Sequence, residues 1–216
     1  MSNEPHDDRY FGGGIESPVD RDELRDAVRS KYRDVALTPD ETFHFHTGRP
    51  NAERCRYDMA EVDALPGRAV QSFAGVANPF EPAAIPAGAK VVDLGCGAGF
   101  DALLAARAAG PDGSVIGVDM TDEMLDEANT NAQLAADAAP ATIEFRSGYL
   151  EDIPVADGWA DVVISNGVIN LCPDKPRVFQ EIARVLRPGG RLQFADIANG
   201  NDVPGEAQRE IDLWTG

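Results

Sequence analysis

The sequence predicts an α/β fold, in which a doubly wound, mainly parallel sheet follows a helical and irregular N-terminal appendage. From residue 89 onward, apolar runs of strand character alternate with helix-forming runs in the order βαβαβαβαβ. The first of these runs, residues 90–94, breaks into a loop with three alternating glycines, Gly95, Gly97 and Gly99, and a run of helix formers follows. One well-packed domain plus an appendage accounts for the 216 residues.

The elements of this domain can be placed along the chain. Strands are expected at about 90–94, 114–118, 142–146, 160–165 and 191–195, and helices at about 100–109, 122–136 and 175–186, with a short turn near 149–152. Pro188-Gly189-Gly190 is expected to close the last helix and to open the fifth strand, because glycine commonly terminates helices.

The N-terminal 88 residues divide into two segments. Residues 1–20 are polar and contain a glycine triplet, so we expect them to be flexible. In the next segment, residues 21–88, the side chains of Leu24, Val28 and Tyr32 are spaced four apart, which predicts a lid or docking helix that packs one stripe on the main domain. A second, short helix is expected near residues 59–65. The main domain is expected to span 89–216.

Composition excludes several classes of function. The net charge of −18 would repel the backbone of a nucleic acid and an anionic membrane surface, so we expect neither as a partner. The chain contains no apolar run long enough to cross a membrane and begins without a hydrophobic signal region, which favours a cytoplasmic location. Its three cysteines have neither disulfide-framework nor zinc-site spacing.

The spacing of the glycine loop restricts the class of ligand that it can bind. A dinucleotide-binding loop follows G-x-G-x-x-G, but Phe100 stands where its third glycine would let helix and strand pack closely. The pattern present is instead D-x-G-x-G-x-G, over residues 93–99. Asp119 ends the second strand, where a carboxylate can accept both hydroxyls of a ribose, while Thr121 and Asp122 are expected to cap the next helix. These features favour a nucleotide-like ligand.

This combination resembles motif I and the ribose position of the class I S-adenosylmethionine-dependent methyltransferases. The resemblance implies S-adenosyl-L-methionine as cofactor and a methyltransferase activity. Together with the crevice expected at the carboxyl ends of the strands, it implies these cofactor-binding residues: Asp93, Gly95, Cys96, Gly97, Gly99, Asp119, Met120, Leu150, Glu151, Ser165 and Asn166. We expect no catalytic side chain, because the sulfonium already activates the methyl group. A Ser/His/Asp triad is excluded, since all three histidines lie in the first 46 residues.

Longer phrases resemble the arsenite methyltransferases in particular. They are GVANPF at residues 75–80, GVDMTDEML at 117–125 and ISNGVINLCPDKPRVFQEIARVLRPGGRL at 164–192. That family holds As(III), a soft ion, with cysteine thiolates. Val76 and Gly167 stand where the family pattern has two of these cysteines. The resemblance implies a small-molecule acceptor, and this departure from the pattern favours an acceptor other than arsenite. A relocated two-thiolate site made by Cys55 and Cys172 is the alternative.

The acceptor pocket is expected to draw on the N-terminal segment. The candidate substrate residues are Tyr32, His44, His46, Arg49, Asn78 and Cys172. His44 and His46 alternate with aromatic residues and could share one face of an extended segment, but no third ligand is evident nearby, so no metal site is expected.

Two further expectations concern the C-terminus and competing functions. Class I methyltransferases usually add two strands after the fifth, whereas only about twenty residues follow Ala195 here, so we expect those strands to be absent. The fifth strand would then be an exposed edge, and a homodimer could cover it. A non-catalytic S-adenosylmethionine-binding module is the main alternative to an enzyme. A nicotinamide-dependent dehydrogenase is disfavoured by Phe100.

Overall fold

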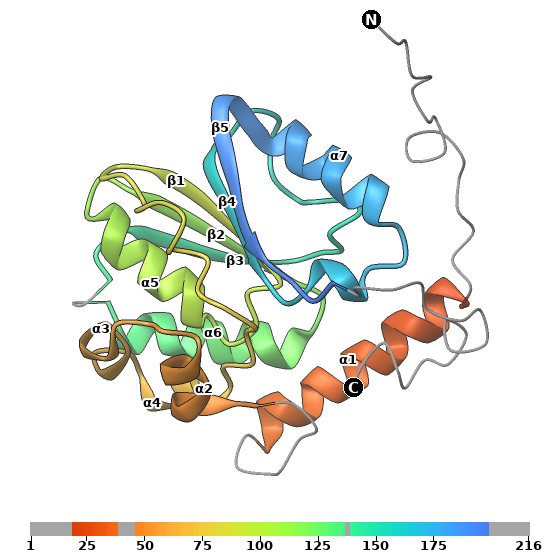
Figure 1. Cartoon of the computed structure of the whole chain (residues 1–216), viewed down its shortest axis with the longest axis horizontal. Coiled ribbons are helices and arrows are strands. Elements are labelled where there is room, and N and C mark those ends of the chain that lie inside the picture. The colour runs from red at the N-terminus through yellow and green to blue at the C-terminus, as the bar shows by residue number, and fades with distance from the viewer. Residues whose placement is uncertain (1–18, 39–45, 137–138, 199–216) are drawn as a thin grey trace, which may run out of the picture.

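The computed structural model describes residues 19–38, 46–136 and 139–198, and its centre is a five-stranded parallel sheet (Figure 1). The strands are β1 (Lys90–Leu94), β2 (Ser114–Asp119), β3 (Thr142–Ser147), β4 (Ala160–Asn166) and β5 (Leu186–Ala195). Their order across the sheet is β3-β2-β1-β4-β5, and every neighbouring pair is parallel. The predicted doubly wound fold is confirmed.

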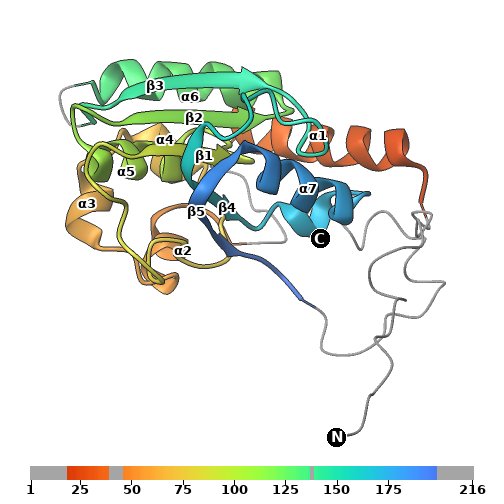
Figure 2. The same cartoon turned by 90° about the horizontal axis from the view of Figure 1, so that it is seen from above.

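Helices cover both faces of the sheet. Helices α5 (Phe100–Ala109) and α6 (Asp122–Leu134) pack on one face, and α7 (Lys175–Val185) packs on the other (Figure 2). Alternate residues of each strand supply the two cores, so Val91 faces α5 while Val92 belongs to the core beneath α7. Apolar residues that face both ways are typical of a parallel sheet buried between helices.

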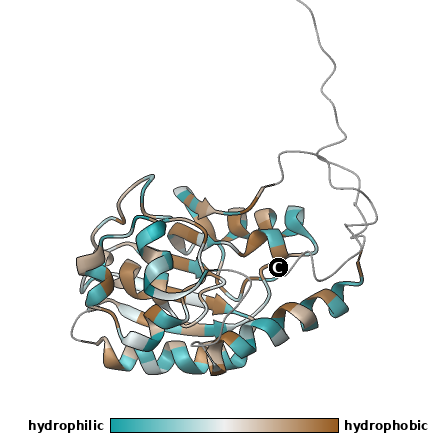
Figure 3. Cartoon of the chain, turned by 60° about the horizontal axis from the view of Figure 1, so that its bottom comes forward, coloured by the Kyte–Doolittle hydropathy of each residue, from teal (hydrophilic) through white to brown (hydrophobic). Residues whose placement is uncertain are grey.

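Among the described residues, four helices precede the sheet: α1 (Arg21–Leu37), α2 (Gly48–Arg54), α3 (Met59–Asp63) and α4 (Gly67–Gln71). Asp20 caps α1, because its carboxylate accepts hydrogen bonds from the backbone N–H groups of Asp22 and Glu23 at 3.0 Å. The helix carries hydrophilic and hydrophobic residues along its length (Figure 3), and it buries the predicted Leu24 and Val28. It continues five residues beyond Tyr32, the last residue of the predicted stripe. Helices α2 and α4 were not predicted, since each is too short to show a periodic pattern.

The fifth strand differs most from its predicted bounds. It begins at Leu186, directly after α7, rather than at Arg191. Leu186 pairs with Ala160, and after an irregularity Arg191 pairs with Val162, so the Pro-Gly-Gly turn lies within the strand instead of before it. Strand β5 lies at one edge of the described sheet, where the side chain of Phe194 is 46% exposed. No described helix is long and apolar enough to cross a membrane.

Candidate cofactor and acceptor site

The order of the strands reverses between β1 and β4, and a cavity lies beyond the carboxyl ends of the strands at this point. Such switch points are the usual ligand sites of open α/β sheets. The lining comes from α1, from Ala69 and residues 72–75, from the loops and helix starts that follow β1 and β2, and from the loops that follow β3 and β4. One cavity therefore reaches both the glycine loop and the N-terminal segment that was expected to hold the acceptor.

The glycine loop forms one wall of this cavity. Gly95 and Gly97 have φ angles of +68° and +49°. Residues other than glycine adopt this backbone region only at a cost in conformational free energy. The backbone N–H of Gly97 donates to Asp119 Oδ2 at 2.9 Å, and that of Thr121 donates to Asp119 Oδ1 at 2.9 Å. Each carboxylate oxygen keeps a further lone pair for a ligand hydroxyl. We call this loop, residues 95–99, together with Asp119 the cofactor wall.

Thr121 occupies the N-cap position of α6, as predicted, but its side chain makes no capping hydrogen bond, and the carboxylate of Asp119 accepts the Thr121 N–H instead. Asp119 therefore has two structural partners in addition to the ribose role predicted for it.

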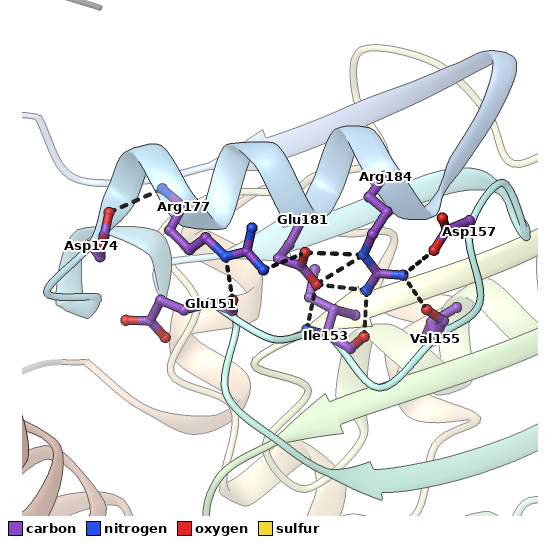
Figure 4. A network of polar contacts seen from close by, with 8 residues as sticks. All are labelled: Glu151, Ile153, Val155, Asp157, Asp174, Arg177, Glu181 and Arg184. Atoms are coloured by element: carbon purple, nitrogen blue, oxygen red, sulfur yellow. Dashed lines mark hydrogen bonds and ion pairs between the residues drawn. The ribbon is translucent and has the colours of Figure 1, made fainter. Parts of the chain in front are cut away.

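A network of polar contacts holds the loop that follows β3 (Figure 4). Glu181 of α7 is 2% exposed, accepts the backbone N–H of Ile153 at 3.0 Å and pairs with Arg184 at 2.6 Å. Arg184 also donates to the carbonyl oxygens of Ile153 and Val155, at 2.7 and 2.8 Å. This loop carries Leu150 and Glu151, which line the cavity. The network thus fixes the side of the cavity that carries two of the predicted cofactor-binding residues.

Helix α1 lines one side of the cavity and is attached to its rim by a row of arginines spaced four apart: Arg21, Arg25, Arg29 and Arg33. Their respective partners are Asp174 at 3.2 Å, Glu151 at 3.5 Å, the Tyr149 hydroxyl at 2.7 Å and Glu123 at 2.9 Å. The guanidinium of Arg25 also lies 4.3 Å from the centre of the Tyr149 ring. Because these partners belong to loops and helices on several sides of the cavity, the row joins α1 to the rim.

The opposite wall depends on Asn166, at the end of β4. Its amide oxygen accepts the backbone N–H of Val76 at 2.8 Å, and its amide nitrogen donates to the carbonyl of Ala77 at 2.8 Å and to Asp101 Oδ2 at 2.9 Å. The Tyr57 hydroxyl donates to the other oxygen of Asp101 at 2.7 Å. We call residues 72–77 and 166–168 the acceptor wall.

Val76 and Gly167 face each other within the acceptor wall. A Cβ atom built on Gly167 would lie 3.1 Å from Cγ1 of Val76, and Gly167 has a φ of +75°. The two positions implied by the arsenite methyltransferase pattern are therefore adjacent in space. In this chain Val76 presents methyl groups and Gly167 presents only a hydrogen atom, where the family pattern has sulfur atoms.

Three carboxylates surround the cavity: the buried Asp93 on β1, the buried Asp101 at the start of α5 and the half-buried Asp119 on β2. Burial raises the pKa of Asp93, and the charges of Asp101 and Asp119 raise it further. Burial likewise raises the pKa of Asp101 to about 6, although its hydrogen bonds from Asn166 and Tyr57 act in the opposite direction. No described arginine or lysine forms an ion pair with any of the three. An unpaired buried carboxylate is costly, so the site suits a ligand that carries positive charge.

The three cysteines have properties that oppose thiolate chemistry. Burial is the largest cause that raises the thiol pKa of Cys55, of Cys96 and of Cys172, the last to about 12. Only Cys96 and Cys172 line the cavity, while the Cys55 thiol lies 3.7 Å from the Gly75 carbonyl oxygen. The described residues contain no group of three or more potential metal ligands of the His, Cys, Asp and Glu type.

Most of the predicted cofactor residues lie together. The cavity is lined by nine of the eleven: Asp93, Gly95, Cys96, Gly97, Asp119, Met120, Leu150, Glu151 and Asn166. Gly99 and Ser165 are absent from its lining, because Gly99 packs against Ala128 and Phe145 and Ser165 is fully buried within the sheet. Of the predicted substrate residues, Tyr32 and Cys172 line the cavity.

The other predicted substrate residues lie elsewhere. Arg49 pairs with Asp63, Asn78 accepts the Phe80 N–H in a turn, and His46 is exposed, so none of the three reaches the cavity. His44 lies outside the described residues. Residues that were not predicted also line the cavity, among them Arg25, Ser72, Phe73 and Asp101. A charged residue at the start of a helix of alanines and leucines was the available signal for Asp101.

Comparisons with known proteins agree with this geometry. A family described as a methyltransferase domain matches residues 85–215. The arsenite methyltransferase of Halobacterium salinarum is 39% identical over 211 residues, which are 91% of this chain and 53% of that protein. The corresponding enzyme of Aquipseudomonas alcaligenes is 47% identical over 131 residues, 59% of this chain and 38% of that protein.

A solved structure is also similar. The arsenic(III) S-adenosylmethionine methyltransferase of Chlamydomonas reinhardtii superposes with a TM-score of 0.65 and 38% identity, covering 69% of this chain and 51% of that one. The chain spans about half the length, or less, of the curated arsenite methyltransferases that it matches. From the matched family, the parallel sheet and the cavity at its switch point, we conclude that the chain belongs to the S-adenosylmethionine-dependent methyltransferases and is similar to arsenite methyltransferases.

Proposed function

We propose that this protein transfers the methyl group of S-adenosylmethionine to a small-molecule acceptor other than arsenite. The observation that carries the proposal is the contact between Val76 and position 167, where the family pattern has two thiolates. As(III) prefers sulfur ligands, and an apolar valine beside a glycine cannot supply them. The cofactor wall does not share this change, so cofactor binding and acceptor choice are separate properties of the site.

The roles proposed within the cavity follow from the positions of its residues. Asp119 would accept the ribose hydroxyls, Leu150 and Glu151 would flank the adenine, and Asn166 would lie at the reactive end of the cofactor. The acceptor would enter against Phe73, Phe100 and Val168, which give that side an apolar lining. An uncharged, partly apolar nucleophile suits such a lining, because anionic acceptors would be repelled by the nearby carboxylates.

Titration with As(III) tests the choice of acceptor. We expect the wild-type protein to bind As(III) weakly, with no change in the Cys55→Ser and Cys172→Ser variants. The Val76→Cys/Gly167→Cys double variant should bind at least tenfold more tightly, although cysteine at a φ of +75° costs about 1 kcal/mol. Tight wild-type binding that is lost on substitution of Cys55 or Cys172 would instead establish the relocated thiolate site.

Turnover separates an enzyme from a binding module. S-adenosylhomocysteine formation should be measured with arsenite, with small thiols and with quinol-like compounds as acceptors. An enzyme of the proposed kind yields product with a thiol or quinol-like acceptor and none above background with arsenite. Tight cofactor binding without product from any acceptor class would favour a non-catalytic module.

The edge strand raises a separate question of assembly. The side chains of Phe179 and Phe194 are 42% and 46% exposed, and their rings pack edge to face with centroids 6.0 Å apart. Exposed strand edges with apolar side chains favour association, so a homodimer across β5 is our proposal for the free protein. Light scattering at several concentrations measures this directly, and a monomer at all concentrations would exclude the dimer.

A further inference from the structure

We propose that Asp101 makes this site prefer the positively charged cofactor over the neutral product that remains after methyl transfer. The inference rests on the family's cofactor, not on the identity of the acceptor. In the transfer, the bond between sulfur and the methyl carbon breaks and its electron pair stays on sulfur. The sulfonium thereby becomes an uncharged thioether, while the rest of the molecule is unchanged. A residue that senses the charge on sulfur can therefore distinguish substrate from product.

Asp101 has the position that such a residue requires. It lies at the start of α5, is 6% exposed and lines the cavity. Its hydrogen bond to Asn166 brings it to the end of β4, so it stands between the cofactor wall and the acceptor wall. The transferred methyl group has to pass between these two walls.

The partners of Asp101 orient its carboxylate without neutralising it. Tyr57 and Asn166 each donate one hydrogen bond, at 2.7 and 2.9 Å, and both side chains are uncharged. Among the described residues, no arginine or lysine forms an ion pair with Asp101. Arg25 is the one cation on the cavity lining, and it pairs with Glu151 and Asp22. The negative charge of Asp101 therefore remains available to a cationic ligand.

Two unpartnered atoms show that the same cavity is built for a ligand. Asp93 is 2% exposed, and its Oδ2 atom has no hydrogen-bond partner. Ser72, on the acceptor wall, is 6% exposed, and its Oγ atom also lacks a partner. Both residues line the cavity. Buried polar groups in proteins are nearly always hydrogen-bonded, so these atoms point to a polar ligand.

Asp101 is better placed to sense the sulfur than the other two carboxylates. Both oxygens of Asp119 accept backbone N–H groups, and its remaining capacity suits the ribose. Asp93 lies within β1, where it is paired with Gly117 and Ile164 of the neighbouring strands. Asp101 alone of the three is linked by a hydrogen bond to the residue that holds the acceptor wall.

Calorimetric titration tests this inference without any acceptor. Dissociation constants for S-adenosylmethionine, S-adenosylhomocysteine and the amine analogue sinefungin should be measured for wild type and for Asp101→Asn at pH 8. An opposite charge within about 4–6 Å shifts an ionisation equilibrium tenfold or more, and we expect a comparable effect on affinity. The variant should lose about tenfold of the wild-type preference for the two cationic ligands, with affinity for the neutral product unchanged.

Three variants control for structural effects. Asp112→Asn removes one exposed carboxylate near the opposite end of β2 and should leave all three affinities as in wild type. Tyr57→Phe removes the hydrogen bond that Tyr57 donates to Asp101 and the one that it accepts from Asn166, but it keeps the charge of Asp101, so it should retain most of the preference. Asp101→Ser serves if Asp101→Asn does not fold. The inference would be overturned if the Asp101 variants bound all three ligands equally more weakly, or if their ratios of dissociation constants equalled those of wild type. It would also be overturned if Tyr57→Phe lost as much of the preference for cationic ligands as Asp101→Asn.

Discussion

The cofactor wall and the acceptor wall face the same cavity but are built in different ways. The cofactor wall is local, because glycines with positive φ shape the loop and Asp119 fastens it through backbone N–H groups. The acceptor wall joins segments about 90 residues apart through the side chain of Asn166. A local loop survives as a recognisable motif, whereas a wall made of distant side chains can change its chemistry at single positions. The difference explains how the cofactor can be assigned while the acceptor that we propose differs from arsenite.

The largest expected effect follows from changing the cofactor wall. A Cβ on Gly97 would meet only Met124 Sδ, at 3.8 Å, so Gly97→Ala should fold with about 1 kcal/mol of strain from its positive φ. The methyl group would project where the backbone must approach the cofactor. We expect affinity for S-adenosylmethionine to fall about 1000-fold, equivalent to about 4 kcal/mol, as measured by calorimetry.

Gly110→Ala is the matched control for this change. Gly110 ends α5 with a φ of +71° and has no atom within 4 Å of its Cβ position, so it carries similar backbone strain far from the cavity. Its thermal stability should fall by a similar amount, with cofactor affinity unchanged. Equal affinities for the two alanine variants would contradict the assignment of the loop.

The second prediction concerns the unliganded protein and pH. The pKa of Asp101 is raised from 3.8 to about 6, so the folded state holds a proton that the unfolded state releases between about pH 4 and 6. The free energy of unfolding should therefore decrease as pH rises through this window, by at most about 3 kcal/mol from this group. Urea denaturation of wild type and Asp101→Asn at pH 4, 5, 6 and 7 measures the contribution.

Most other carboxyl groups cancel in this comparison. Asp119 and Asp196 also have raised pKa values, and Glu144, Asp161 and Glu181 have lowered ones, but all five remain in both proteins. The exception is Asp93, whose pKa the charge of Asp101 raises, so the difference between the two curves reports Asp101 together with its effect on Asp93. Parallel curves for wild type and variant would show that Asp101 is ionised equally easily in both states.

A third, smaller effect is expected from the network in Figure 4. Glu181→Gln removes a buried charge whose partner is Arg184, and it weakens the contact that fixes the loop after β3. Unfolding free energy should fall by about 2 kcal/mol, because glutamine keeps part of the hydrogen bonding. Asp157→Asn changes an 81%-exposed partner of the same arginine and should cost less than about 1 kcal/mol. Similar losses in both variants, measured by urea denaturation, would contradict a special role for the buried partner.

The two walls also differ in how well the sequence predicted them. Strand alternation, the glycine loop and Asp119 are local patterns, and the structure brought nine of the eleven predicted cofactor residues to one cavity. Arg49 and Asn78 were expected at the acceptor because of their residue type and segment, but tertiary contacts direct them to Asp63 and to a turn. The hydrogen bonds that join Tyr57, Asp101 and Asn166 are invisible in the sequence, because no periodic pattern connects residues so far apart.

The smallest effect should come from helix α1, which is attached to the rim mainly by exposed charges. Arg33 and Glu123 pair at 2.9 Å with side chains that are 58% and 32% exposed, so Arg33→Gln should change stability by less than about 0.5 kcal/mol. Because four arginines act together along the helix, cofactor affinity should nevertheless weaken about threefold between 0.1 and 1 M salt, where screening shortens from about 10 to 3 Å. Arg33→Gln should show a weaker salt dependence, whereas Arg56→Gln, which breaks a surface pair with Glu81 away from α1, should match wild type. Identical salt dependence in all three proteins would mean that apolar contacts of Leu24 and Val28, rather than the arginine row, hold the helix against the cavity.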